Sequence, residues 1–270
     1  AEHARSRAEQ AVGDVTNLAN ELERLSAKTA AKLERSLFTL VGAMGKTAAQ
    51  LGPLDLKDAA AVRPHLEELL QRFPDCDSFW TVIPPGHLAC VAPAVYESAI
   101  GTDITHQRHI QQVFERKMPV FSSIFELVEE KGRYALSVQI PVFHQERMTG
   151  TVAAVFRPER IVPNLIPEEL RQHPAARLWC VQDDGYVLYA NDDTHQIGTY
   201  LFQDRNCAKH PELARFAERM LSEPAGIGCF RCPTSTRRHV IHRVAAWQTL
   251  GPSESNRWKI VVIEPYEVND

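Results

Sequence analysis

Apolar residues recur at steps of three and four, and at multiples of these, from Val12 to Leu51. Such spacing keeps the apolar side chains on one face, so the pattern predicts one amphipathic helix over residues 8–51. A helix of ~40 residues is roughly 60 Å long, which exceeds the size of one small domain. The length therefore suits a stem that lies along two stacked modules, with an outer face on which a second copy of the chain packs.

The pattern changes to a shorter helix and then to strands after Gly52 and Pro53. Asp58 is placed to cap a helix over residues 59–72, and Thr105 is placed to cap a short helix over residues 106–117. Runs of β-branched and aromatic residues around these helices predict antiparallel strands. The expected strands of this first block cover residues 79–83, 88–91, 120–125, 134–142 and 150–156.

A second block follows a proline-punctuated connector over residues 157–174. Its Asp183-Asp184-Gly185 sequence is a strong signal for a hairpin turn, and a helix is expected over residues 211–222. The order of hairpin, glycine turn, helix and three strands thus occurs twice, without a repeat of individual residues, which predicts two similar modules. The expected strands of the second block cover residues 179–182, 186–191, 227–232, 239–247 and 258–264.

The composition is that of an ordinary folded protein, with 44% hydrophobic and 24% charged residues among 270. A net charge of -4 gives no electrostatic reason to expect nucleic acid as a partner. No apolar run reaches the length of about 18 residues that a membrane-spanning helix needs. The sequence also lacks G-x-S-x-G, H-E-x-x-H and glycine-rich phosphate-binding motifs, so it predicts neither an enzyme nor a cofactor.

Six cysteines permit disulfides, but their spacing leaves the chemistry open. Cys76 and Cys90 lie at the first predicted hairpin, where they either bridge neighbouring strands or remain buried thiols. Cys229 and Cys232 form a C-x-x-C pair, for which zinc, disulfides and a redox motif are alternatives. Zinc is disfavoured because the other two cysteines do not form a second closely spaced pair.

Residues 100–156 are the most informative part of the chain. They join a Gly-Thr-Asp turn at residues 101–103, a short helix that carries Arg108, and strand-like runs marked by Pro141 and Gly150. This order of motifs resembles the membrane-distal module of double Cache sensors, the extracytoplasmic ligand-binding regions of bacterial and archaeal receptors.

The resemblance covers about residues 55–265, since the second block shares the Asp-Gly turn, the Ile197-Gly198 step and the closing run from Trp258. It implies an α+β fold in which a long N-terminal helix packs along two tandem PAS-like modules, each an antiparallel sheet flanked by helices. In this family the distal module usually holds the small-molecule ligand. The implied divisions are a stem helix at residues 1–54, a membrane-distal module at 55–160 and a membrane-proximal module at 161–270.

The resemblance also implies that Arg108 anchors a ligand carboxylate, for which a planar guanidinium is suited. Pairing with Asp103 or a surface acid is the alternative. In members of this family that bind amino acids, a downstream aspartate usually holds the ligand amine. Residues 134–142 contain no acidic residue, so the sequence favours a simple organic anion over an amino acid. Tyr134 and Ser137 lie three apart on a strand, so only one of them is expected to face the ligand. The other candidate contacts are Trp80, Asp103, Thr105, His109 and Ser122.

His106 and His109 share a helix face, a spacing that suits a metal or a pH sensor. A chance pair among 11 histidines is the simpler interpretation, so no metal site is predicted. Asp183, Asp184, Asp192 and Asp193 are interpreted as turn residues, because no calcium-loop pattern continues from them.

The sequence therefore predicts the periplasmic, ligand-binding region of a transmembrane signalling receptor. Flanking membrane helices are expected to anchor it, the stem helix to pair it as a homodimer, and a small carboxylate to bind in the distal module. A ligand-free structural or dimerisation ectodomain that signals through a protein partner is one alternative, and a soluble enzyme is another. Histidine kinase, cyclic-dinucleotide enzyme and chemotaxis receptor all remain open as outputs.

Overall fold

A computed structural model describes residues 2–127, 132–191, 197–201, 211–233, 240–253 and 256–266. The chain divides into two compact units. The central unit comprises residues 35–164 and 252–256, and the terminal unit comprises residues 1–34, 165–251 and 257–270.

Helix α1 (Glu2–Leu51) is the amphipathic helix that the apolar spacing predicts, and it begins before the expected residue 8. Its first part, to residue 34, belongs to the terminal unit and the remainder belongs to the central unit. No helix within the described ranges is long and apolar enough to span a membrane. The buried face of α1 includes Leu22, Leu25, Leu33, Leu37, Met44 and Leu51.

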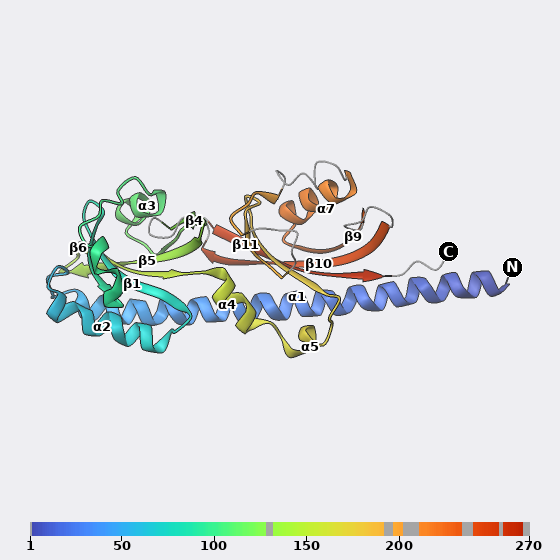
Figure 1. The fold of residues 1–270 in the computed structure, drawn as a ribbon, viewed down its shortest axis with the longest axis horizontal. Coiled ribbons are helices and arrows are strands. Elements are labelled where there is room, and N and C mark those ends of the chain that lie inside the picture. The colour runs from blue at the N-terminus through green and yellow to red at the C-terminus, as the bar shows by residue number, and fades with distance from the viewer. Residues whose placement is uncertain are drawn as a thin grey trace. The chain divides into compact units, whose positions relative to one another are not determined.

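The central unit is built on an antiparallel sheet with the strand order β2-β1-β6-β5-β3, in which β4 also pairs with β5. Helices α1 and α2 lie on one side of this sheet and α3 lies on the other (Figure 1). The strands are β1 (Cys76–Ile83), β2 (His87–Ala92), β3 (Val120–Phe121), β4 (Phe125–Glu126), β5 (Tyr134–His144) and β6 (Arg147–Phe156). The helices are α2 (Ala59–Arg72), the 3-10 helix η1 (Ala94–Ala99), α3 (Arg108–Arg116) and α4 (Pro158–Leu165).

Capping residues explain where two of these helices begin. The Asp58 carboxylate accepts hydrogen bonds from two backbone N–H groups of the first turn of α2, at 3.0 and 3.3 Å, as predicted. The predicted Thr105 cap is wrong. Helix α3 begins after Gln107 without a side-chain cap, because the Thr105 hydroxyl donates to the Asp103 carboxylate instead.

The strand predicted over residues 120–125 is interrupted. Val120 pairs with Gln139 in β5, whereas Phe125 pairs with Ala135, so the register shifts by one residue between β3 and β4. The Ser122 N–H still donates to the Ser137 carbonyl oxygen at 2.8 Å, so the shift falls on residues 123–124, which lie outside both strands. Apolar alternation alone does not reveal such a shift, because it depends on the partner strand.

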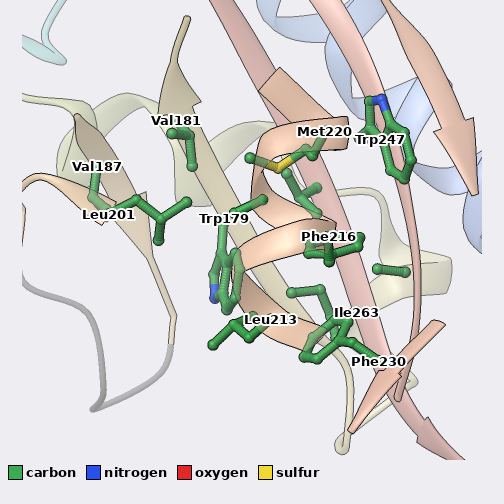
Figure 2. Close-up of a cluster of buried hydrophobic side chains, with 13 residues drawn as sticks. Trp179, Val181, Val187, Leu201, Leu213, Phe216, Met220, Phe230, Trp247 and Ile263 are labelled. Atoms are coloured by element: carbon green, nitrogen blue, oxygen red, sulfur yellow. The ribbon is translucent and has the colours of Figure 1, made fainter. Parts of the chain in front are cut away.

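The terminal unit holds a second antiparallel sheet, with the strand order β8-β7-β11-β10-β9. Helix α7 (Pro211–Ser222), which lies where the sequence predicts a helix, buries Phe216 and Met220 in the core shown in Figure 2. The Phe216 ring centroid lies 4.7 Å from that of Phe230 and 5.7 Å from that of Trp247. The other elements are α5 (Glu168–Arg171), β7 (Arg177–Gln182), β8 (Val187–Ala190), β9 (Ala225–Pro233), β10 (Val240–Ser253) and β11 (Asn256–Tyr266).

Both sheets have the same strand order. Counted along each unit, the order is second, first, fifth, fourth and third, with β3 and β4 together in the third place of the central unit. The predicted Asp-Gly turn joins β7 to β8, and Gly185 adopts the positive φ of 94° that favours glycine there. Asp192 and Asp193 lie outside the described residues. The two predicted modules are thus alike in topology although their residues do not repeat.

Candidate ligand-binding cavity

A cavity of about 280 Å³ lies in the central unit. Alternate residues of a strand point to the same face of its sheet, and such residues from three strands form the floor. These are Ser78, Trp80 and Val82 of β1, Ser137 and Gln139 of β5, and Ala153 and Val155 of β6. The segment between β2 and α3, which includes η1, contributes Tyr96, Ser98, Ala99, Thr102, Ile104 and Gln107.

Asp77 reaches the cavity through a β-bulge in β1. Against β6, Cys76 pairs with Phe156 and Ser78 pairs with Val155, so Asp77 is an extra residue in the strand. A bulge re-aims side chains that strict alternation would send to the opposite face. Asp77 and its neighbour Ser78 therefore both line the cavity.

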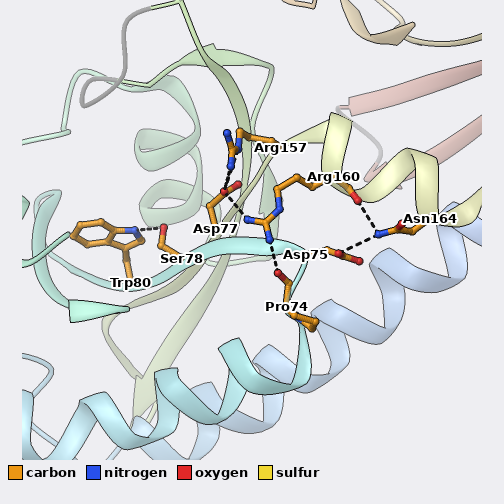
Figure 3. A network of polar contacts seen from close by, with 8 residues as sticks. All are labelled: Pro74, Asp75, Asp77, Ser78, Trp80, Arg157, Arg160 and Asn164. Atoms are coloured by element: carbon orange, nitrogen blue, oxygen red, sulfur yellow. Dashed lines mark hydrogen bonds and ion pairs between the residues drawn. The ribbon is translucent and has the colours of Figure 1, made fainter. Parts of the chain in front are cut away.

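Two arginines bind one oxygen of the Asp77 carboxylate (Figure 3). Arg157 donates from Nε and Nη2 to Oδ1, at 3.0 and 2.7 Å, and Arg160 donates from Nη1 to the same oxygen at 2.9 Å. The other oxygen, Oδ2, is buried and has no hydrogen-bond partner among the described residues. A buried acceptor without a donor is costly, and because Oδ2 is shielded from the cavity space, an N–H or O–H group of a ligand reaches it only after a side-chain movement.

Aromatic side chains form an apolar wall. Trp80 donates from Nε1 to the Ser78 hydroxyl at 2.8 Å, and its ring centroid lies 6.4 Å from that of Tyr96. Trp80 also belongs to a buried apolar cluster with Ile104 and Ala153, which line the cavity too. This wall would bury the carbon skeleton of a small molecule.

Hydrogen bonds to each other and to neighbouring residues hold the side chains of Ser137 and Gln139 on β5. Gln139 donates from Nε2 to the Ser137 hydroxyl at 3.0 Å, and Thr151 donates from its hydroxyl to Gln139 Oε1 at 2.7 Å. The backbone N–H of Ser137 donates to the Ser122 hydroxyl at 2.8 Å. The cavity therefore has a polar side whose orientation is set before a ligand enters.

His109 lines the cavity from α3 and is 8% exposed. Its ring stacks on Phe125 with centroids 5.6 Å apart. Burial lowers the pKa of His109 from 6.5 to about 4, because removing water disfavours the charged imidazolium. The imidazole is therefore neutral at pH 7.

Arg108, the expected carboxylate anchor, is exposed and does not line the cavity. It is the first residue of α3, which buries His109, Ile110 and Val113. Successive residues of a helix are about 100° apart, so Arg108 lies on the side away from these three. The expectation of a buried guanidinium at this position is wrong.

The structure brings three of the other predicted contacts together, since Trp80, His109 and Ser137 all line the cavity. Tyr134 does not, in keeping with the strand alternation that allows only one of Tyr134 and Ser137 to face it. Ser122 does not line the cavity, but its hydroxyl accepts a hydrogen bond from the backbone N–H of Ser137, which does.

Asp103 and Thr105 lie in the turn before α3 and do not line the cavity. The Thr105 backbone N–H and hydroxyl donate to the Asp103 carboxylate at 2.8 and 2.6 Å, which lowers the pKa of Asp103. Sequence reasoning missed Asp77 and Arg157. For Arg157 a signal was present, because it continues the alternate positions of β6 beyond Val155.

Cys76 and Cys90 are both buried free thiols, so the structure agrees with the second of the two alternatives and not with a bridge between neighbouring strands. Cys90 pairs with Thr81, five residues along β1 from Cys76. At ~3.3 Å per residue this separation is roughly 16 Å, well beyond the ~7 Å that a disulfide allows between Cα atoms.

Cys229, the first cysteine of the C-x-x-C pair, is exposed and free. The Cys232 side chain and all of Cys207 lie outside the described part of the chain. Within the described ranges, no cluster of three His, Cys, Asp or Glu side chains is arranged to hold a metal ion.

Residues 36–158 match the family model described as "HK/GC/Chemotaxis protein-like, sensor domain". The match covers less than half of the chain, and every residue that lines the cavity lies within it. A search of curated proteins finds no match.

Solved structures with this fold include extracellular sensor domains. An extracellular ligand binding receptor from Desulfohalobium retbaense is 23% identical over 90% of this chain, with a TM-score of 0.72, and the chain spans only 40% of its length. The ligand-binding domain of the Pseudomonas aeruginosa amino acid chemoreceptor PctC, in complex with GABA, is 16% identical over 91% of this chain and 99% of its own, with a TM-score of 0.63. That of the Pseudomonas fluorescens chemoreceptor CtaA, in complex with L-serine, is 14% identical over 93% and 98%, with a TM-score of 0.68.

These comparisons confirm the predicted likeness to Cache-type sensor domains. They also confirm the α+β fold, with a long N-terminal helix followed by two antiparallel sheets and their flanking helices.

Proposed function

We propose that this chain is the extracytoplasmic ligand-binding region of a transmembrane signalling receptor, and that its central unit binds a small organic molecule carrying a carboxylate. The cavity of about 280 Å³ is the observation that supports this proposal. It lies inside the segment that matches the sensor-domain model, and its volume suits a molecule smaller than a typical drug.

Arg157 supplies positive charge at the cavity wall and takes over the anchoring role that the sequence assigned to Arg108. A carboxylate that leaves water must be paired with a positive charge, and Arg157 carries such a charge at the cavity wall. The ion pair with Asp77 holds Arg157 in place, since its side chain is 19% exposed and that of Asp77 only 9%.

Asp77 restricts the chemical class of the ligand further. Its buried Oδ2 has no donor among the described residues, so a ligand with an O–H or N–H group beside its carboxylate would satisfy it once a side-chain movement opens this atom to the cavity. Hydroxy acids and amino acids both have this chemistry. GABA and L-serine, the ligands in the PctC and CtaA complexes, are carboxylates with N–H donors.

The receptor signals when the ligand favours one of two conformations of the region, and flanking helices carry that difference across the membrane. A second copy of the chain packs on α1, where the apolar side chains of Val12 and Phe38 are 67% and 57% exposed. The periplasmic side of the membrane is the corresponding location.

A thermal-shift screen of the purified chain against hydroxy acids, amino acids and plain mono- and dicarboxylates tests the proposal. A ligand at a hundred times its dissociation constant adds about 2.7 kcal/mol of stability and raises the melting temperature. Arg157→Lys retains the charge but loses the planar fork, so it should weaken binding, whereas the control Arg108→Ala should not. Failure of every acid to stabilise the folded chain would favour the ligand-free dimerisation ectodomain instead.

A further inference from the structure

We infer that His109 contacts the bound ligand and takes up one proton from solvent as an anionic ligand enters, so that affinity rises as the medium becomes acidic. This inference rests on the proposed function and adds to it the uptake of a proton on ligand binding. It gives the sensor a response that combines ligand concentration with pH.

The first observation is that the imidazole is buried and lines the cavity without a hydrogen-bond partner among the described residues. His109 is 8% exposed and lines the cavity from α3, opposite the polar side chains of β5. Within the described ranges no group hydrogen-bonds to its ring, and its one specific contact there is the stack on Phe125. A buried imidazole usually has a hydrogen-bond partner, so a ligand is the natural source of one.

The second observation is the set of charges around the ring. Among the described residues, the other titratable groups that line the cavity are Asp77, Tyr96 and Arg157. Asp77 is already paired with two arginines, so its negative charge is balanced. From the elements packed against α3, Glu126 of β4 is exposed and accepts from the backbone N–H of Gly132.

Tyr134 of β5 lies outside the cavity lining, and β3 consists of Val120 and Phe121, neither of which titrates. Without a ligand, nothing in these elements offers an unbalanced negative charge to an imidazolium, and desolvation keeps the ring neutral. A ligand carboxylate in the same cavity supplies that charge, and its attraction for the imidazolium is stronger than in bulk water because the ring is buried.

The expected size of the effect follows from proton linkage. If the bound carboxylate returns the pKa of His109 to its ordinary value of about 6.5, affinity is roughly tenfold higher at pH 5.5 than at pH 7.5. The free protein contributes little to this ratio, because its imidazole, with a pKa of about 4, is neutral at both pH values. Each acid used as a probe carries an ionised carboxylate at both pH values, and because the second carboxyl group of L-malate is only partly ionised at pH 5.5, its ratio is judged against that of His109→Gln.

Calorimetric titrations at pH 5.5 and 7.5 with L-lactate, L-malate, L-serine and GABA test the inference. We expect at least one of these acids to bind the wild-type chain roughly tenfold more tightly at pH 5.5, whereas His109→Gln should bind it equally at both. His106→Gln is the matched control, since His106 is exposed and outside the cavity lining, and it should behave as the wild type does.

Heats measured for the wild type in two buffers of different ionisation enthalpy count the protons directly, so the test does not depend on the folding of a variant. Binding without pH dependence and without proton uptake overturns the role of His109 but leaves the proposed function intact. A tenfold ratio of the affinities at pH 5.5 and 7.5 that persists in His109→Gln also overturns the role of His109 and leaves the proposed function intact. If none of the four acids binds at either pH, both proposals fail.

Discussion

Asp77 and Arg157, which both line the cavity, meet at 2.7 Å between Oδ1 and Nη2. The pair joins the extra residue of the β1 bulge to the residue that directly follows β6. It thus holds two neighbouring strands together where the polar part of a ligand would lie. Because both side chains line the cavity, loss of this ion pair would change both the stability of the central unit and the shape of its cavity.

Asp77→Asn should lower the free energy of unfolding by about 2–3 kcal/mol, because it leaves two guanidinium groups without their shared carboxylate. The value is set below that of a fully buried pair, since the Arg160 side chain is 40% exposed. Urea unfolding followed by circular dichroism measures the change. Asp75→Asn is the control, since Asp75 accepts one bond at 3.1 Å, from Asn164 at the surface, and should cost less than about 1 kcal/mol. Equal losses in the two variants would contradict the role of Asp77 as the shared partner of both arginines.

The pKa of His109 predicts a pH dependence of stability in the absence of ligand. Its folded-state pKa of about 4 lies below the unfolded value of 6.5, so the unfolded chain binds more protons between these pH values. Stability is therefore fully present above pH 6.5 and falls by up to about 1.4 kcal/mol per pH unit as the pH drops toward 4.

His109→Gln removes that contribution, so the difference in unfolding free energy between wild type and variant should change by more than about 1 kcal/mol between pH 7 and pH 5. Urea titrations at each pH give this difference. His106→Gln, whose residue is exposed, should show a constant difference from the wild type. A difference that is equally flat for His109→Gln would mean that the buried ring does not resist protonation.

Gly150 of β6 lies where a Cβ atom would collide with the Val82 carbonyl oxygen and the Leu56 side chain. Gly150→Ala should therefore force neighbouring strands apart and cost about 2–3 kcal/mol. In Gly42→Ala, on α1, the added methyl group meets nothing within 4 Å, so the gain in helix propensity should stabilise the chain by about 0.5–1 kcal/mol. Denaturation curves should show a lower free energy of unfolding for Gly150→Ala and a higher one for Gly42→Ala. If Gly150→Ala were as stable as the wild type, the strands would not be packed this closely.

The cysteines differ in exposure, and alkylation at pH 8 followed by mass spectrometry should separate them. Burial raises the pKa of Cys76 to about 12 and also raises that of Cys180, so these thiols should react only after unfolding. Exposed Cys229 should react in the native protein. A non-reduced peptide map that contains a Cys76–Cys90 bridge would contradict the register between β1 and β2, in which Cys90 pairs with Thr81.

The sequence by itself determined the elements and their order. The apolar stripe of α1, the Asp58 cap of α2 and the Asp-Gly turn between β7 and β8 are local signals, and each predicted an element that the structure contains. Strand alternation also separated Ser137, which lines the cavity, from Tyr134, which does not. These signals act over a few residues, within which backbone preferences and burial agree.

The tertiary structure alone decided which side chains meet. The bulge that brings Asp77 to the cavity, and the register that keeps Cys76 away from Cys90, both depend on strands that are distant in sequence. Arg108 was misplaced because the packing of α3, which buries His109, Ile110 and Val113, decides which face of the helix turns inward. A shift of one residue reverses the face of a strand and turns a helical side chain by about 100°, so periodicity predicts that a pocket-facing side exists, while long-range pairing determines which residues occupy it.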